Sequence, residues 1–257
     1  MKRLLVLLSA TLAAPLPAQV ISDAGSECLR FQSSGAICYV AGKQAESEGN
    51  KPQALSFYRK GAEKRDAFCK SNLARLCLFD DSLSCKAEGA RQAKDACLAG
   101  NAKGCIWYAQ ALLSKGKQKE LATWYKKACD LGDANGCSML ATEVATEELG
   151  RYDIGGGTAQ GLALLYKACQ LEENANGLNC IRLAKNSTGV LSKWAYRKSC
   201  DNGNAASCFY LAEALQADDY AANKTFIQNV YSSVCYKNIW PYGKEKACKK
   251  IEELYNR

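Results

Sequence analysis

The chain has 257 residues, of which 48% are hydrophobic, enough for one ordinary domain or for an array of repeats. Its formal net charge is +8, but basic residues are interspersed with acidic ones, which favours a solvated surface over a nucleic-acid-binding patch. The 15 cysteines are accompanied by no histidine and by no C-x2-C spacing, which argues against zinc and iron–sulfur sites. We therefore expect no metal, no cofactor and a disulfide framework formed in an oxidising compartment.

Residues 1–18 have the features of a signal peptide. Lys2 and Arg3 give a positive start, an apolar stretch follows, and residues 15–18 form a plausible cleavage region. An uncleaved anchor is the alternative, although the stretch is shorter than the roughly 20 residues that a membrane span needs. No later apolar run could cross a bilayer, so we expect a periplasmic or secreted protein without stable membrane insertion.

Residues 19–257 are expected to form a single all-α domain. Alanine, leucine, lysine and glutamate dominate this part of the chain, and alternating valine and isoleucine runs are missing. In chain order, we predict helices at 38–50, 52–69, 105–115, 118–129, 137–149, 158–169, 208–217 and 220–235.

Pairs of cysteines recur along the chain with a mean period of about 34 residues, which indicates a solenoid of helical hairpins. Four pairs have the spacing C-x7-C and three follow the same rhythm more loosely. We expect six or seven hairpins with one bridge across each pair. The predicted bridges are Cys28–Cys38, Cys69–Cys77, Cys97–Cys105, Cys129–Cys137, Cys169–Cys180, Cys200–Cys208 and Cys235–Cys248.

The residues between paired cysteines predict how each hairpin turns. In the segment 129–137, Gly132 can adopt the left-handed conformation that ends a helix, and Asp133 can cap the next one. Segments 97–105 and 200–208 repeat this arrangement. A tight turn of this kind brings the two cysteines together, so a disulfide across it is geometrically reasonable.

Cys85 belongs to no pair in this scheme and is predicted to be a free thiol. It could be a buried, inert side chain, or a redox-active thiol directed at a partner. The third possibility is that the pairing scheme is wrong at this point.

The sequences that flank the cysteines resemble Sel-one-like repeats, which are relatives of the tetratricopeptide repeat. The aromatic and basic run 124–128 precedes one first cysteine, and Leu140-Ala141 follows the matching second cysteine. The resemblance covers most of residues 28–257 and is closer to the cysteine-rich Hcp-like branch, in which each hairpin carries one disulfide. It implies a right-handed α-solenoid. Two segments depart from the pattern: the run 57–62 comes early relative to Cys69, and no small pair follows Cys77.

The resemblance implies a protein-binding scaffold. Its most specific form is a periplasmic immunity protein that neutralises a type VI, phospholipase-like effector; a general envelope adaptor or host-interaction factor is the alternative. We expect a free monomer that binds an acidic partner surface. The candidate partner-binding residues are Trp107, Tyr108, Phe209 and Tyr210, although burial of most of them in the core is the competing interpretation.

Hcp-like relatives also imply penicillin binding or weak β-lactamase activity. The only supporting pattern is Ser-x-x-Lys at residues 114–117, and the companion motifs of serine β-lactamases are missing. The chain also has no histidine to serve as a base. We therefore predict no catalytic residues.

Overall fold

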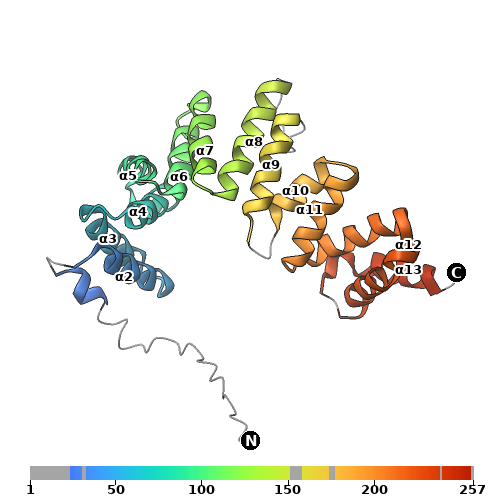
Figure 1. The fold of residues 1–257 in the computed structure, drawn as a ribbon. Helices are drawn as coiled ribbons and strands as arrows, with labels where there is room; N and C mark the ends of the chain where they lie inside the picture. Colours follow the sequence, from blue (N-terminus) through green and yellow to red (C-terminus); the bar gives the residue numbers. More distant parts are fainter. Residues whose placement is uncertain (1–23, 31–32, 151–157, 174–176, 238, 256–257) are drawn as a thin grey trace, which may run out of the picture. The chain divides into compact units, whose positions relative to one another are not determined.

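The computed structural model describes residues 24–30, 33–150, 158–173, 177–237 and 239–255, and within them it contains helices and no strand. The predicted all-α class is confirmed (Figure 1). The predicted signal peptide at 1–18 lies outside the described residues. The helices are α2 (Gly35–Ser47), α3 (Lys51–Glu63), α4 (Ala67–Phe79), α5 (Lys86–Leu98), α6 (Ala102–Leu113), α7 (Leu121–Asp130), α8 (Ala134–Leu149), α9 (Ala159–Leu171), α10 (Leu178–Asn186), α11 (Gly189–Asp201), α12 (Ala205–Tyr236) and α13 (Lys244–Tyr255).

Internal contacts divide the chain into two compact units, residues 1–92 and 93–257, with the boundary inside α5. Helices that follow one another in the chain pack against each other within each unit, as expected for successive hairpins. The first unit has a core built around Tyr58 and Leu73, and the second has several smaller clusters along its length. One continuous solenoid over residues 19–257 stays a prediction.

Helix α12 consists of two helices joined at Asp219, whose backbone angles are not helical (φ −153°, ψ 90°). The Asp219 side chain accepts a hydrogen bond from the Ala222 amide at 3.0 Å, so it caps the second helix. The two halves correspond to the predicted helices 208–217 and 220–235.

The predicted single helix at 52–69 is wrong, because the chain turns between α3 and α4. Arg65 adopts a positive φ of 65°, and the side chain of Asp66 caps α4 by accepting a hydrogen bond from the Cys69 amide at 2.7 Å. The same positions in the turn between α7 and α8 are held by Gly132 and Asp133. An arginine in a sequence does not indicate a left-handed backbone conformation as a glycine does, so the sequence did not predict this turn.

The hairpins close through a contact between two small residues, one before each cysteine of a pair. A Cβ atom added to Gly136 would lie 2.5 Å from the Cβ of Ala128, closer than two carbon atoms approach without a clash. This contact explains why glycine occurs inside the first turn of α8. The equivalent pairs are Ala96 with Gly104, and Ser199 with Ser207, whose hydroxyls are hydrogen-bonded at 2.8 Å.

Seven disulfides join consecutive helical segments, with Cα atoms 4.4–4.9 Å apart. Each spans a turn, which fits the disulfide-stapled hairpins expected from the cysteine period. Six are predicted pairs: Cys28–Cys38, Cys97–Cys105, Cys129–Cys137, Cys169–Cys180, Cys200–Cys208 and Cys235–Cys248.

The predicted Cys69–Cys77 bridge and the predicted free thiol at Cys85 are both wrong. The seventh bridge joins Cys77, near the end of α4, to Cys85, which directly precedes α5, and Cys69 is the free, buried thiol. Cys69 and Cys77 both belong to α4, where eight residues of helical rise separate them by about 12 Å, too far for a disulfide.

We expect Cys69 to be unreactive in the folded protein. It is fully buried, and burial raises the pKa of its thiol far above the ordinary value, so almost no thiolate forms. A thiol reagent should modify one cysteine per chain after denaturation and none before it. Mass mapping of the alkylated protein should place that label on Cys69, and a label on Cys85 would contradict the observed pairing.

Candidate functional site

The structure separates the four predicted partner-binding aromatic residues. Phe209 has 0% exposure and lies in the core beside Tyr231, so its predicted role in partner binding is wrong. The residue after the second cysteine faces inward here, because it lies on the side of α12 that packs against the helix after Asp219. Tyr210 is partly exposed and contacts the rings of Tyr196 and Trp240, with centroids 5.5 and 5.7 Å away.

Trp107 and Tyr108 on α6 are also partly exposed. Trp107 packs on the cluster that contains the Cys97–Cys105 bridge. Tyr108 meets Trp124 of α7 edge to face, with ring centroids 4.6 Å apart, and Lys94 lies over the Tyr108 ring. Tyr210 on α12 does not join Trp107 and Tyr108 in one site. The role of these three residues in partner binding stays a prediction.

A pocket of about 490 Å³ in the second unit is a candidate site that sequence reasoning missed. It lies between α7 and α9, with residues of α8 contributing to its lining. Its volume is in the range of roughly 300–1,000 Å³ that small-ligand pockets occupy. The lining residues are Ala122, Thr123, Lys126, Cys129, Asp130, Leu140, Val144, Gln160, Ala163, Leu164 and Lys167.

The rim of this pocket carries two lysines and one aspartate. Lys126 Nζ is 2.7 Å from one carboxylate oxygen of Asp130, and Lys167 Nζ is 3.8 Å from the other. The hydrogen bond from Lys126 lowers the pKa of Asp130, so this carboxylate is ionised at neutral pH. Three charges of which two are positive leave the rim with an excess of one positive charge.

In the equivalent groove between α9 and α11, two aromatic side chains meet. The rings of Tyr166 and Trp194 have centroids 4.8 Å apart. Tyr166 stands three residues before the first cysteine of its pair, as Lys126 does, and Trp194 stands six residues before, as Ala163 does. The pocket therefore occurs where a repeated groove carries lysine and alanine in place of tyrosine and tryptophan.

The floor helix α8 carries a carboxyl group that is unfavourably placed at neutral pH. Burial raises the pKa of Glu143 above its ordinary value, so the ionised form of this side chain destabilises the folded state. The stability of the folded protein therefore falls as the pH rises from the ordinary pKa of a glutamate through the raised pKa of Glu143. We expect Glu143→Gln to melt at a higher temperature than the parent at pH 7. The difference should shrink as the pH is lowered and the parent carboxyl is protonated; an equal difference at pH 7 and pH 3.5 would contradict this.

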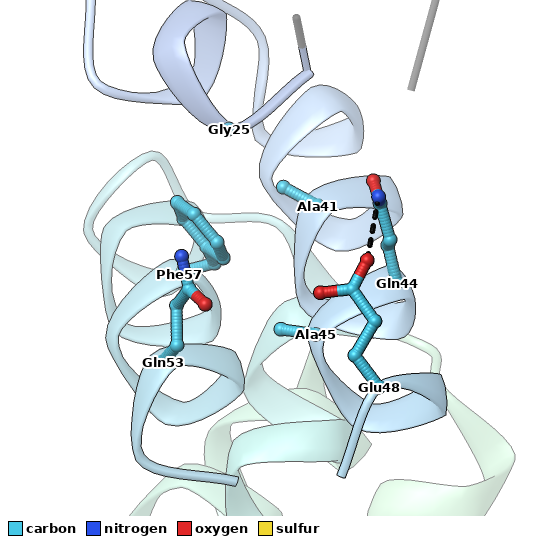
Figure 2. Close-up of a pocket in the computed structure, with 7 residues that line it drawn as sticks. All are labelled: Gly25, Ala41, Gln44, Ala45, Glu48, Gln53 and Phe57. Carbon is cyan, nitrogen blue, oxygen red and sulfur yellow. Dashed lines mark hydrogen bonds between the residues drawn. The ribbon is translucent and has the colours of Figure 1, made fainter. Parts of the chain in front are cut away.

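A smaller pocket of about 100 Å³ lies in the first unit, between α2, α3 and the segment that contains Gly25 (Figure 2). Gln44 and Glu48 of α2 also line it, and a hydrogen bond of 2.8 Å joins them. The ring of Phe57 and the methyl groups of Ala41 and Ala45 line its wall. The volume is too small for more than a few water molecules or a small side chain.

The Ser-x-x-Lys match does not assemble a nucleophile. Ser114 caps the end of α6, and its hydroxyl donates a hydrogen bond to the carbonyl oxygen of Ala111 at 3.0 Å. The Lys117 ammonium pairs with Glu120 at 3.3 Å. A serine nucleophile needs a base that accepts its proton, and here the lysine is paired with a carboxylate and not with the Ser114 hydroxyl.

We expect Ser114→Ala to leave any β-lactam turnover of the purified protein unchanged, because the hydroxyl serves only as a cap. Nitrocefin hydrolysis by the parent and the variant is the measurement. Loss of turnover in the variant would make Ser114 a catalytic residue and overturn the interpretation of this motif.

One group of side chains in the described part of the chain has the spacing of metal ligands, namely Cys77, Cys85 and Glu88. The two cysteines form a disulfide, and Glu88 accepts hydrogen bonds from Arg59 at 2.6–3.2 Å. The sulfur atoms and the carboxylate are thus already engaged. Among the described helices, none is both long and apolar enough to cross a membrane.

No family model and no curated protein matches the sequence. Among solved structures, the chain is similar to a Sel1 repeat protein from Oxalobacter formigenes, with 14% identity, a TM-score of 0.55, and coverage of 82% of this chain and 94% of the other. It also matches c5321, a protective antigen of uropathogenic Escherichia coli strains with the same repeat fold, with 19% identity, a TM-score of 0.38, and coverage of 87% and 57%. The chain therefore has the fold of Sel1 (Sel-one-like) repeat proteins, stapled by a disulfide at seven turns.

Proposed function

We propose that this protein is an exported scaffold that binds another protein through the surface between α7 and α9. The open pocket in that groove is the observation that carries the proposal. Its floor includes three apolar residues, of which Leu140 is buried and Val144 and Leu164 are partly exposed. An apolar recess with a charged rim suits a protein side chain.

The bridges on either side favour a preformed binding surface. Cys129–Cys137 ties α7 to α8, and Cys169–Cys180 ties α9 to α10, so each wall of the pocket belongs to a cross-linked hairpin. A surface that is already ordered loses little conformational entropy when a partner binds.

The charges of the pocket favour binding over catalysis. A general base should have a pKa near the working pH, whereas the lysine contact lowers the pKa of Asp130. Lys126 and Lys167 both pair with the Asp130 carboxylate. The cysteine of the lining, Cys129, is in a disulfide, so it offers no thiol as a nucleophile.

Seven disulfides suggest an oxidising compartment outside the cytoplasm. Export by a signal peptide at residues 1–18 completes the proposal. Amino-terminal sequencing of the protein purified from the extracytoplasmic fraction tests it. A chain that begins near Gln19 supports export with cleavage, and a chain that retains residues 1–18 contradicts it.

Site-specific photocrosslinking in the cells that encode the protein tests the scaffold role. A benzophenone side chain at Thr123, on the rim of the pocket, should give a discrete adduct with one protein, and the same group at Lys249 in α13 should not. Lys249 is exposed in the same unit but does not line the pocket, so it controls for random collisions. Absence of any protein adduct from Thr123 would sink the proposal.

The immunity role is the finer form of this proposal, with a type VI, phospholipase-like effector as the partner. Its test is co-expression of the protein with the product of the adjacent gene, directed to the periplasm. The immunity role predicts that the neighbouring product is toxic alone and harmless together with this protein. A neighbour without toxicity would leave the scaffold role intact and remove the immunity role.

A further inference from the structure

We infer that the pocket between α7 and α9 receives an aromatic side chain from an acidic segment of the partner protein. This inference rests on the proposed scaffold function and names the chemistry that the partner brings. Three observations lead to it: the register of the repeats, the side chains that are missing from this groove, and the charge of its rim.

Two contacts show that the α7–α9 and α9–α11 grooves are built in the same register. The lysine two residues before the first cysteine reaches back to the residue that follows the first cysteine of the preceding helix pair. In the second groove, Lys198 donates a hydrogen bond to the carbonyl oxygen of Gln170 at 2.7 Å. In the first, Lys167 lies 3.8 Å from the Asp130 carboxylate. Positions in the two grooves can therefore be compared one for one.

The comparison identifies what the first groove lacks. Tyr166 and Trp194 contact each other in the second groove, and Lys126 and Ala163 hold their positions in the first. Replacing the indole by a methyl group removes nine non-hydrogen ring atoms, and the lysine is drawn aside to Asp130 at 2.7 Å. The space that remains has the position, in the repeat, of an aromatic ring.

The walls of this space are suited to a ring supplied from outside. Val144 and Leu164 are partly exposed next to buried Leu140, so apolar surface is left uncovered at the floor. Inserting an aromatic side chain would remove this surface from water, which is the main source of binding energy for an anchor residue.

The charge of the rim selects the residues that flank the anchor. Lys126 and Lys167 together carry two positive charges against the single negative charge of Asp130. Carboxylates next to the aromatic anchor would balance this excess and could hydrogen-bond either ammonium group. Basic residues at the same places would be repelled, so the rim gives specificity as well as attraction.

Nuclear magnetic resonance titration with a defined probe tests this inference. The probe is the capped peptide acetyl-Glu-Asp-Trp-Asp-Glu-amide, with one control peptide that carries Ala for Trp and another that carries Lys for every acid. We expect saturable shifts of the amide signals of Val144, Ala163 and Leu164 with the acidic Trp peptide, and no saturable shift with either control. Equal shifts with all three peptides, or none at these residues, would overturn the inference.

A groove-filling variant gives the matched control on the protein side. Lys126→Tyr combined with Ala163→Trp copies the side chains of the neighbouring groove and should abolish saturable binding while leaving the helical circular dichroism spectrum and melting temperature close to those of the parent. Lys126→Gln with Lys167→Gln keeps the space and removes the charge, so binding should weaken about three- to tenfold at low salt. Undiminished binding by the groove-filling variant would contradict the inference, and Ala163→Leu gives a smaller obstruction if the double variant folds poorly.

The partner itself separates this inference from the proposed function. If the Thr123 photocrosslink captures a protein and the groove-filling variant still binds that protein with unchanged affinity, the scaffold role stands and the pocket inference fails. If the single-residue compound N-acetyl-tryptophan binds as tightly as the acidic peptide, the pocket is a small-molecule site and the inference also fails. If no protein is captured at all, the scaffold role fails.

Discussion

The Gly61→Ala variant is expected to lose roughly 3 kcal/mol of unfolding free energy, because its new methyl group has no space. A Cβ atom at Gly61 would lie 2.1 Å from the Cys69 sulfur, 2.7 Å from the Cys69 Cβ and 3.2 Å from the Cβ of Cys38. All these neighbours are buried, and Cys38 is fixed by its bridge to Cys28, so α3 and α4 must separate. Chemical denaturation followed by circular dichroism measures the loss.

The second substitution Cys69→Gly should restore much of that stability. The double variant would have alanine and glycine at the two positions where Ala128 and Gly136 close the hairpin of α7 and α8. Cys69→Gly alone should also destabilise, because it leaves a cavity and places glycine inside a helix, at about 1 kcal/mol for the backbone effect. A favourable coupling energy of about 1–3 kcal/mol is expected in the double-mutant cycle. A double variant no more stable than Gly61→Ala would show that the two hairpins do not close in the same way.

Removal of the bridge between α7 and α8 is the second change with a large expected effect. Cys129→Ala with Cys137→Ala opens a loop of about nine residues and should cost roughly 2–3 kcal/mol in the chain-entropy account. Cys129 also lines the pocket, so the variant should bind the acidic Trp peptide more weakly than the parent.

The bridge Cys200–Cys208 provides the matched control, since it has the same sequence separation of 8 and lies outside the pocket lining. Its removal should cost similar stability. Under conditions in which nearly all molecules are folded, it should leave the affinity for the peptide unchanged. Denaturant midpoints and peptide titrations of both variants are the measurements. Equal loss of binding in the two variants would mean that global stability, and not the local hairpin, governs the pocket.

The fold was largely predictable because it repeats a strong local signal. A glycine with positive φ occurs at positions 100, 132 and 203, each followed by an asparagine or aspartate that caps the next helix. That combination marks a turn wherever it occurs. At position 65 an arginine takes the left-handed conformation, and the signal is lost although the turn is the same.

The error in disulfide pairing has the same origin. Ala62 stands where the other hairpins carry the first cysteine, so the hairpin of α3 and α4 has no bridge. Cys69 stands at the position of Gly136, where its amide donates to the cap, and it resembles a first cysteine only by its distance from Cys77. Spacing in the sequence cannot separate these cases without knowing where α4 begins.

The candidate site was less predictable, because it consists of what is absent from one groove. Aromatic residues are common anchors at protein interfaces, and the prediction that Phe209 lies at the surface for this reason is wrong. The pocket could have been found by aligning the positions three and six residues before each first cysteine and asking which groove lacks large side chains. That comparison requires knowing that these positions meet across neighbouring helices, which the Tyr166–Trp194 contact establishes.

Hydrogen–deuterium exchange of the protein, alone and saturated with the partner captured from Thr123, tests the central claim most directly. Binding in the pocket predicts slower exchange in peptides from residues 121–130 and 159–171, because these two helices form the pocket walls. The groove-filling variant should show no such protection at the same partner concentration. Unchanged exchange in both helices of the parent, with protection elsewhere, would contradict the account.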